Sequence, residues 1–240
     1  MSPDRRTSRG PHPKDEGCFA ESALPALRSA VQDLSWLLSR GYSMKAALPL
    51  VGDRHLLRDR QRKALRRCAA SDRNCTNREQ RRVQPESLRG QSLSADGYNV
   101  LLTIEAALSD GLLLLGRDGA LRDLAAMSRH YRRVAVTRQA VELIARHLDG
   151  VGCARVLWCL DRPVSNSARL KRLIEETVVE NESSWSVELT SRTDQLLMES
   201  TAIVATADSA ILDKCSRWYN LARAVVEDSV RDAWILDLSS

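Results

Sequence analysis

The feature that most constrains the fold is the alternation of short apolar runs with helical stretches from Gln91 to the C-terminus. The apolar runs predict strands, and the longer stretches between them repeat apolar residues at helical spacing. Alternation of strand and helix favours a mainly parallel sheet that helices cover on both faces. We therefore expect a three-layer α/β/α domain over residues 91–240.

The apolar runs and the periodic stretches place the individual elements. Strands are expected at 92–95, 112–115, 133–136, 155–160, 185–189, 202–206 and 233–238. Helices are expected between them, at 100–108, 121–131, 138–148, 168–179, 194–200, 209–215 and 218–226.

The first 90 residues differ in texture from the rest of the chain. Residues 1–23 combine prolines, glycines and charges, which is typical of a disordered tail. Over 24–70 apolar residues recur at helical spacing between Gly and Ser punctuation, which predicts a small all-helical basic module. Residues 71–90 lose this periodicity and are rich in arginine, so we expect a basic linker there.

The charge is unevenly distributed along the chain. The net charge is +5, yet eleven basic residues oppose four acidic ones between Asp53 and Arg82, and acids dominate from Glu175 onward. A basic half beside an acidic half suits a protein that holds a polyanion with one part and a metal with the other. Arg62 and Arg66 are the candidate nucleic-acid-binding residues of the basic module. The alternative is a solvated arginine-rich face.

Aspartates follow three of the apolar runs, at the points where the expected strands end. They are Asp96, Asp161 and Asp208. Ligands of open parallel sheets bind beyond the carboxyl ends of the strands, so these carboxylates can converge on one spot. Carboxylates that lie together repel one another unless a cation neutralises them, and oxygen ligands suit Mg²⁺ or Mn²⁺.

A carboxylate-bound divalent cation has a definite chemistry. It can activate a water molecule and stabilise the charge that develops on a phosphodiester, without a serine, cysteine or histidine nucleophile. The sequence therefore favours a nuclease with Asp96, Asp161 and Asp208 as catalytic metal ligands. The alternative is structural, because aspartates after strands often cap the next helix or form Asx turns.

Two of these motifs resemble a known superfamily. The run DGYNV at 96–100 resembles the opening strand-end motif of the NYN group of PIN-like ribonucleases, and TADSAIL at 206–212 is similar to their late strand and aspartate. The resemblance covers roughly Gln91 to Leu238 and implies a PIN-like fold. It implies Asp161 as a further metal ligand and Asp194 as an acidic helix-start ligand. The chain as a whole, with its basic helical front end, also resembles a family of uncharacterised prokaryotic proteins.

PIN domains usually carry one more acid on an early helix. Glu142 is one candidate, and Glu105, which lies one expected helix earlier, is the other. The residues alone do not decide between them, so both remain candidate metal ligands.

A polar loop after the strand at 155–160 opens the next expected helix. Exposed amides at such a helix start, together with nearby arginines, can hold a phosphate, although simple helix capping is the alternative. Asn99 can orient a metal-bound water or tie down its own loop. The candidate nucleic-acid-binding residues outside the basic module are thus Asn99, Arg162, Ser165, Asn166 and Arg169.

These patterns together predict an Mg²⁺- or Mn²⁺-dependent endoribonuclease, with RNA as partner and DNA as the alternative substrate. The competing hypothesis is a catalytically inactive PIN-like protein that binds nucleic acid or acts as a scaffold. A phosphohydrolase that acts on a small phosphate ester is the third hypothesis, but the Asp-x-Asp pattern of haloacid dehalogenases is absent after the first strand. The P-loop GxxxxGK[ST] of nucleotide hydrolysis and the dinucleotide-binding GxGxxG are absent as well.

The remaining composition bears on location and partners. The N-terminus has no apolar signal segment, no apolar stretch reaches membrane-spanning length, and the six cysteines form no CxxC pair. We expect a cytoplasmic protein with no membrane partner and no zinc site. Self-association is compatible with the sequence.

Overall fold

A five-stranded parallel sheet forms the centre of the computed structural model, which describes residues 10–124, 136–164, 166–180 and 184–239. Its strands are β1 (Ser92–Asp96), β4 (Arg155–Asp161), β5 (Trp185–Thr190), β6 (Ile203–Ala205) and β7 (Trp218–Tyr219). They lie in the order β5-β4-β1-β6-β7, and every neighbouring pair is parallel. The chain moves outward from β1 to β5, then returns to place β6 on the other side of β1. The strand order therefore reverses between β1 and β6.

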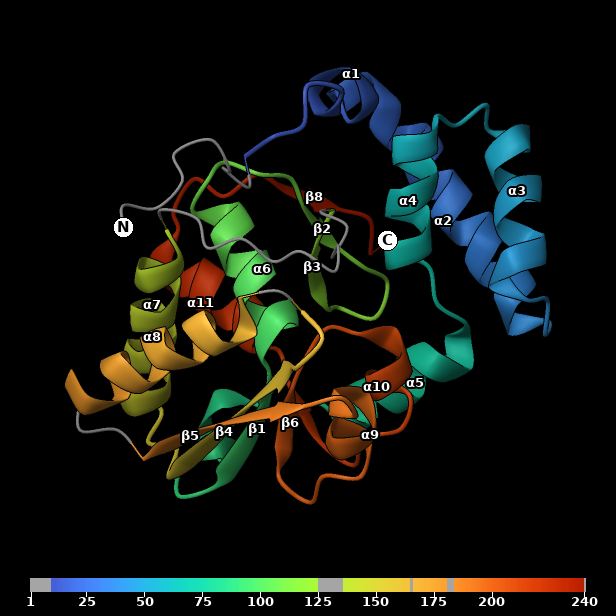
Figure 1. Cartoon of the computed structure of the whole chain (residues 1–240). Coiled ribbons are helices and arrows are strands. Elements are labelled where there is room, and N and C mark those ends of the chain that lie inside the picture. The colour runs from blue at the N-terminus through green and yellow to red at the C-terminus, as the bar shows by residue number, and fades with distance from the viewer. Residues whose placement is uncertain (1–9, 125–135, 165, 181–183, 240) are drawn as a thin grey trace.

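Helices cover both faces of this sheet (Figure 1). One face carries α6 (Gly97–Ala107), α7 (Thr137–Gly150), α8 (Ser167–Glu180) and α11 (Leu221–Ser229), and the other carries α9 (Thr193–Met198) and α10 (Ser209–Leu212). Alternate residues of β6 feed the two layers, since Ile203 and Ala205 belong to one core cluster and Val204 to another. The sheet is thus buried on both faces, as its apolar strands require.

A second, smaller sheet lies beside the first. It consists of β3 (Leu121–Asp123), β2 (Leu113–Leu115) and β8 (Ile235–Asp237) in that order, with β2 and β3 antiparallel and β2 and β8 parallel. Its two faces serve different cores. Leu113 and Leu121 join the core of the large sheet, whereas Leu114 and Leu236 join the core of the N-terminal helices.

The N-terminal region is helical. Its α-helices are α1 (Asp15–Cys18), α2 (Leu24–Ser39), α3 (Met44–Arg54), α4 (Asp59–Cys68) and α5 (Asp72–Arg81), with 3-10 turns η1 (Glu21–Ala23) and η2 (Pro85–Leu88). Serine side chains begin two of the helices: Ser43 Oγ accepts a hydrogen bond from the Ala46 amide, and Ser71 Oγ accepts one from the Asn74 amide. Among the helices of the described residues, none is both long and apolar enough to cross a membrane.

The α/β class, the mainly parallel sheet and the helical N-terminal region are confirmed. Other expectations were wrong in detail. Residues 121–123 form β3 instead of beginning a helix, and Trp218–Tyr219 forms β7 before α11 starts. Helix α5 occupies the segment expected to be a linker, and α1 lies in the expected disordered tail. The strand expected at 133–136 falls almost entirely outside the described residues.

Each of these differences has a tertiary cause. β3 is held by its antiparallel pairing with β2, and β7 by its pairing with β6. Helix α5 is fastened by Arg78, whose buried side chain reaches the α/β domain, and by the Trp218 indole, which donates a hydrogen bond to the Arg78 carbonyl oxygen at 2.7 Å. Such contacts are invisible to local sequence periodicity.

Candidate functional site

Four aspartates lie at the carboxyl edge of the large sheet, around the point where the strand order reverses. Asp96 ends β1, Asp161 ends β4, Asp194 opens α9 and Asp208 immediately precedes α10. A crevice beyond the strand ends at such a reversal is where open α/β sheets bind ligands. The sequence therefore placed its four principal acidic candidates at one edge of the molecule.

Asp96 is the most perturbed of the four. Its Oδ2 accepts a hydrogen bond of 2.8 Å from the Thr206 hydroxyl at the end of β6. Burial raises the pKa of Asp96 to about 7, the Thr206 hydrogen bond opposes this rise, and the charges of Asp208 and Asp194 add to it. The Asp96 carboxyl group thus links the ends of β1 and β6, and its surroundings destabilise its charged form.

Gly97 allows α6 to start close to the neighbouring strand. A Cβ at this position would collide with the Leu160 side chain and lie 3.1 Å from the Cys159 carbonyl oxygen. The glycine that follows Asp96 is therefore required by packing against β4, and it brings the start of α6 down onto the sheet edge.

Asp208 is exposed and performs a structural task. Its Oδ1 accepts hydrogen bonds from the amides of Ala210 at 2.8 Å and Ile211 at 3.3 Å, which caps α10. The helix-capping alternative is thus realised at this position, and Oδ1 is engaged. A role for the second carboxylate oxygen is compatible with the cap.

Asp161 and Asp194 complete the acidic edge. Burial raises the pKa of Asp194, and the charges of Asp208 and Asp161 raise it further. Within the part of the chain that the structure describes, neither side chain accepts a hydrogen bond. The charges of these carboxylates interact with those of the other aspartates, but no hydrogen bond among the described residues holds either side chain in place.

Asn99 fastens the end of β6 to the start of α6. Its Oδ1 accepts a hydrogen bond of 2.7 Å from the Ala207 amide, while the Ala207 carbonyl accepts one of 2.8 Å from Arg122 Nε. The residue between Thr206 and Asp208 is therefore held from both sides. Asn99 ties down the loop, which was one of its two expected roles.

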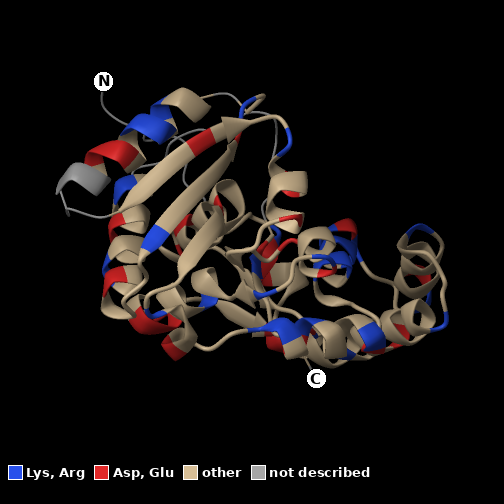
Figure 2. Cartoon of the chain, turned by 90° about the horizontal axis from the view of Figure 1, so that it is seen from below, with Lys and Arg blue, Asp and Glu red and all other residues tan. Residues whose placement is uncertain are grey.

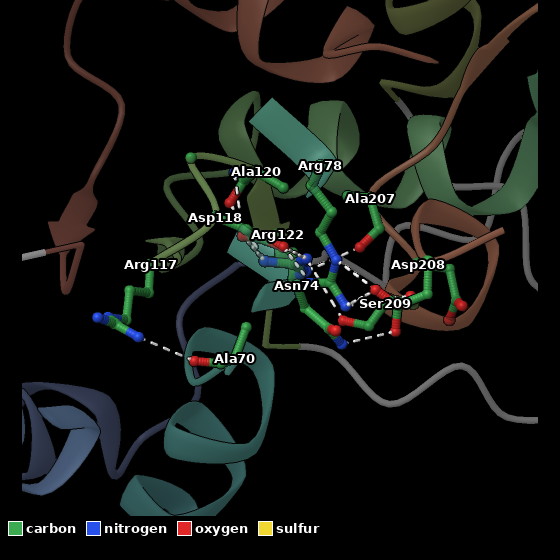
Figure 3. A network of polar contacts seen from close by, with 12 residues as sticks. Ala70, Asn74, Arg78, Arg117, Asp118, Ala120, Arg122, Ala207, Asp208 and Ser209 are labelled. Atoms are coloured by element: carbon green, nitrogen blue, oxygen red, sulfur yellow. Dashed lines mark hydrogen bonds and ion pairs between the residues drawn. The ribbon is translucent and has the colours of Figure 1, made fainter. Parts of the chain in front are cut away.

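A buried ionic network lies directly beneath this edge (Figure 3). Asp118 accepts hydrogen bonds from Arg122 at 2.6 and 2.8 Å and from Arg78 at 2.5 Å, and all three residues are at most 4% exposed. Burial raises the pKa of Asp118, but the charges and hydrogen bonds of Arg122 and Arg78 outweigh it and hold the pKa at about 2. Arg78 also pairs with Asp213 at 2.6 Å.

Sequence reasoning missed this network. Asp118 also accepts a local hydrogen bond of 3.2 Å from the Ala120 amide, two residues further along the chain. Arg78 and Arg122 carry no local signal that separates them from the other arginines. In the sequence, Asp118 lies 40 residues from Arg78 and 4 residues from Arg122, and Asp213 lies 135 residues from Arg78.

A cavity of about 700 Å³ lies beside the network, between the N-terminal helices and the acidic edge. Five basic side chains line it: Lys63, Arg66, Arg67, Arg78 and Arg122. Asn99, Asp208 and Asp213 line it as well, so the cavity opens onto one flank of the acidic edge. Figure 2 shows the basic positions of the N-terminal helices interleaved with acidic ones.

The two arginines expected from the basic module have different surroundings. Arg62 is held by the Leu57 carbonyl at 2.8 Å and by Asp53 at 2.7 Å, so it stabilises the turn between α3 and α4. Arg66 is exposed and lines the cavity. The neighbouring Lys63 and Arg67 were not singled out from the sequence, although they lie on the same helix.

The loop before α8 adjoins Asp161. Arg162 donates a hydrogen bond to the Leu189 carbonyl at 3.1 Å, and Asn166 adopts a left-handed backbone with φ of 65°. The Asn166 carbonyl accepts from the amides of Arg169 and Leu170 at the start of the helix. Arg169 is exposed at this helix start, and Ser165 lies outside the described residues.

Neither glutamate candidate is placed with the aspartates by a direct contact. Glu105 is fully buried and accepts a 2.5 Å hydrogen bond from the Thr137 hydroxyl, which joins α6 to the start of α7. It lies about 12 Å along α6 from Gly97, given 1.5 Å per helical residue. Glu142 is half-buried in α7. The further acid that the PIN resemblance leads one to expect is thus not identified by contact geometry.

The donor set at the acidic edge suits a hard divalent cation in kind, since it consists of carboxylate oxygens. Burial and neighbouring carboxylates raise the pKa of Asp96, which means that they destabilise its charged form. A bound cation would offset that destabilisation. In the side-chain positions present, no group of three His, Cys, Asp or Glu residues among those described is arranged to hold a metal. Binding would therefore require the carboxylates to move closer together.

The fold and this edge define a doubly covered parallel α/β protein with an acidic strand-end cluster and an adjoining basic cavity. The chain belongs to the family described as a domain of unknown function (DUF5616), whose model matches residues 85–224. Residues 26–81 match a second family, a protein of unknown function (DUF434).

Comparison with curated proteins gives one informative relative. The chain is 26% identical over 187 residues to an uncharacterized protein of Methanocaldococcus jannaschii, which covers 78% of this chain and 89% of that protein. No solved structure matches the chain significantly. The relatives support the joint occurrence of both regions in one protein and carry no stated activity.

Proposed function

We propose that this protein is a divalent-metal-dependent endoribonuclease that belongs to the PIN-like superfamily. The observation that carries the proposal is the position of Asp96, Asp161, Asp194 and Asp208 around the reversal of strand order, beside a cavity lined by basic side chains. Acids that can hold a metal and cations that can hold phosphates are the two parts that such an enzyme needs.

The residues divide these tasks by position. Asp96, Asp161, Asp194 and Asp208 would hold Mg²⁺ or Mn²⁺, which when bound supplies an activated water and neutralises developing phosphate charge. Asn99 and Thr206 position the strand ends from which Asp96 and Asp208 project. Arg66 and Arg169 are exposed on either side and would bind the phosphates of the RNA backbone.

The direct test is cleavage of labelled single-stranded and structured RNA with Mn²⁺ or Mg²⁺ present. We expect metal-dependent cutting by the wild type and its loss in Asp96→Asn and Asp208→Asn. Asp149→Asn, which removes an exposed carboxylate in the last turn of α7, is the matched control and should cut normally. Equal cutting by all four proteins would rule out the acidic edge as the active site.

Asp208 needs a second variant, because it also caps α10. Asparagine keeps the capping oxygen, whereas Asp208→Ala removes it and should cost about 1 kcal/mol of stability. A role as metal ligand predicts that both variants lose activity. A role only as a cap predicts that Asp208→Asn stays active while Asp208→Ala unfolds more easily.

A second candidate function is a catalytically inactive member of the same fold that binds nucleic acid or acts as a scaffold. The engagement of Asp208 Oδ1 in the cap favours it, as does the lack of a ready three-residue metal group among the described side chains. RNA binding without cutting, together with calorimetry that detects no Mn²⁺ binding, would establish this alternative over the nuclease.

A further inference from the structure

Two kinds of side chain line the cavity between the N-terminal helices and the acidic edge, and they form its basic wall and its apolar wall. The basic wall consists of Lys63, Arg66, Arg67, Arg78 and Arg122. The apolar wall consists of Leu38, Met44, Ala69, Ala70 and Leu124. The walls come from α2, α3, α4, α5 and the residues around β3, so the cavity exists only because the N-terminal region packs against the rest of the chain.

Two residues of the basic wall, Lys63 and Arg66, carry charge that no described residue neutralises. Lys63 and Arg66 lie three residues apart on α4, so their side chains share one face of that helix and repel each other. Within the described part of the chain, neither makes a hydrogen bond or an ion pair. Two unpaired cations at a cavity can donate charge-assisted hydrogen bonds to an anionic guest.

Two further arginines of the wall are held rigidly by paired carboxylates. Arg78 and Arg122 share Asp118, and Arg78 also pairs with Asp213, so their guanidinium groups are fixed by several hydrogen bonds. Five cationic side chains line the cavity against the carboxylates of Asp208 and Asp213. The excess charge, together with Asn74 and Ser71 as polar lining residues, suits a phosphate group.

The apolar wall excludes inorganic phosphate as a sufficient ligand. Leu38 and Met44 are half-buried, so each presents apolar surface to the cavity. A volume of about 700 Å³ is far larger than one phosphate needs and falls within the range of small-molecule sites. A guest that combines a phosphate with a larger, partly apolar group would contact both kinds of lining residue.

We propose that this cavity binds a nucleoside monophosphate, with the phosphate against Lys63 and Arg66 and the base against Leu38 and Met44. The ligand chemistry is shared by a free nucleotide and by the phosphorylated end of an RNA strand. The site is separate from the acidic edge in its residues except at its Asn99–Asp208 flank, and binding requires no divalent cation. It therefore stands whether or not the protein cuts RNA.

The test is isothermal titration of the full chain in EDTA with adenosine 5′-monophosphate, adenosine and inorganic phosphate. We expect the monophosphate to bind at least tenfold more tightly than either of the other two. The variant Lys63→Met with Arg66→Met should weaken binding of the monophosphate by tenfold or more. Leu38→Ser should weaken the monophosphate while leaving the weak binding of inorganic phosphate unchanged.

The matched control replaces Lys14 and Arg231 with methionine, which removes the same charge from exposed positions outside the cavity. Because Lys63 and Arg66 are exposed, the double variant should fold, and thermal unfolding checks this. Equal affinity for adenosine and its monophosphate, or equal weakening by the control pair, would overturn the proposal. Absence of monophosphate binding to folded wild type would overturn it as well.

Two oligonucleotides separate the sources of the ligand. If a 5′-phosphorylated hexanucleotide binds more tightly than both its 5′-hydroxyl form and the mononucleotide, the site receives a strand end. If the mononucleotide binds as tightly as the phosphorylated hexanucleotide, the site receives a free nucleotide. Either result supports the cavity as a nucleoside-phosphate site, and a cleavage assay run separately decides the nuclease proposal.

Discussion

Asp96 lies where β1 and β6 diverge, with one oxygen bonded to Thr206 and with two other aspartates close enough to raise its pKa. Its surroundings favour the protonated carboxyl in the absence of a cation. The folded pKa, about 7, lies above the ordinary value of 3.8. The folded state therefore binds the Asp96 proton more tightly than the unfolded chain does.

We predict that the metal-free wild type loses stability as the pH rises from about 4 to about 7, because the folded state must then ionise Asp96. Asp96→Asn keeps the acceptor for Thr206 without titrating. Its melting temperature should exceed that of the wild type at pH 8, by about 2–4 °C for each kcal/mol regained, and match it at pH 4. The measurement is thermal unfolding of both proteins in EDTA across this pH range. If the melting temperatures of the two proteins change with pH in parallel, Asp96 is not the group that causes the loss of stability.

For Asp118, unlike Asp96, we predict that replacing the carboxylate with an amide lowers the stability of the protein. Asp118→Asn leaves two buried guanidinium groups without their shared carboxylate, so we expect a loss of about 3–5 kcal/mol in the free energy of unfolding. Asp72→Asn breaks the exposed pair with Arg117 and should change stability little, because solvent screens that pair. Urea unfolding of both variants provides the comparison.

The pH dependence of the wild type offers an independent check on Asp118. Its folded pKa of about 2 lies below the ordinary 3.8, so its contribution is present above pH 4 and lost as the pH falls through about 2. Asp118→Asn should remove that part of the acid-induced loss. Equal stability of Asp118→Asn and the wild type at pH 7 would show that the network is not stabilising.

At the scale of elements, sequence patterns located the strands of the large sheet well. β1, β4, β5 and β6 begin and end within one residue of the expected strands, and Asp96, Asp161 and Asp208 follow their apolar residues. The four aspartates could therefore be predicted to lie at one edge. The basic cavity could not, because its walls come from segments on both sides of the expected linker.

The misread elements are either very short strands or a helix held by partners distant in sequence. Leu121–Asp123 and Trp218–Tyr219 have only three and two residues, too few for a period to show. Helix α5 has a mostly polar sequence, and its buried Arg78 makes contacts that no apolar pattern reveals. Charge pairing across more than a hundred residues requires the fold to be known first.

Strand β8 gives a prediction at the same scale. Leu236 is buried between the small sheet and the N-terminal helices, whereas its neighbour Ile235 is 37% exposed. Leu236→Ala should cost about 2–5 kcal/mol, and Ile235→Ala should cost clearly less. Chemical denaturation of the two variants is the measurement, and equal losses would contradict the docking of β8 onto this core.

At the scale of the whole molecule, the N-terminal helices and the α/β region are joined by a common core. Leu114 and Leu236 of the small sheet pack with Leu27, Leu34 and Leu65 of the helices. Arg78 and Trp218 add a polar connection on the other side of the cavity. The cavity and the acidic edge are therefore held in a fixed relation by the packing around them.

The return of the chain end to β2 has a consequence for how the molecule can be divided. The two matched families end at residues 81 and 224, whereas β8 spans Ile235–Asp237 and pairs with β2 in the middle of the second match. A fragment that ends at residue 224 would lack β8, which would leave one edge of β2 unpaired and expose the apolar surface against which Leu236 packs. Recombinant fragments that follow the family limits should aggregate, and dissection of this protein must keep its last strand.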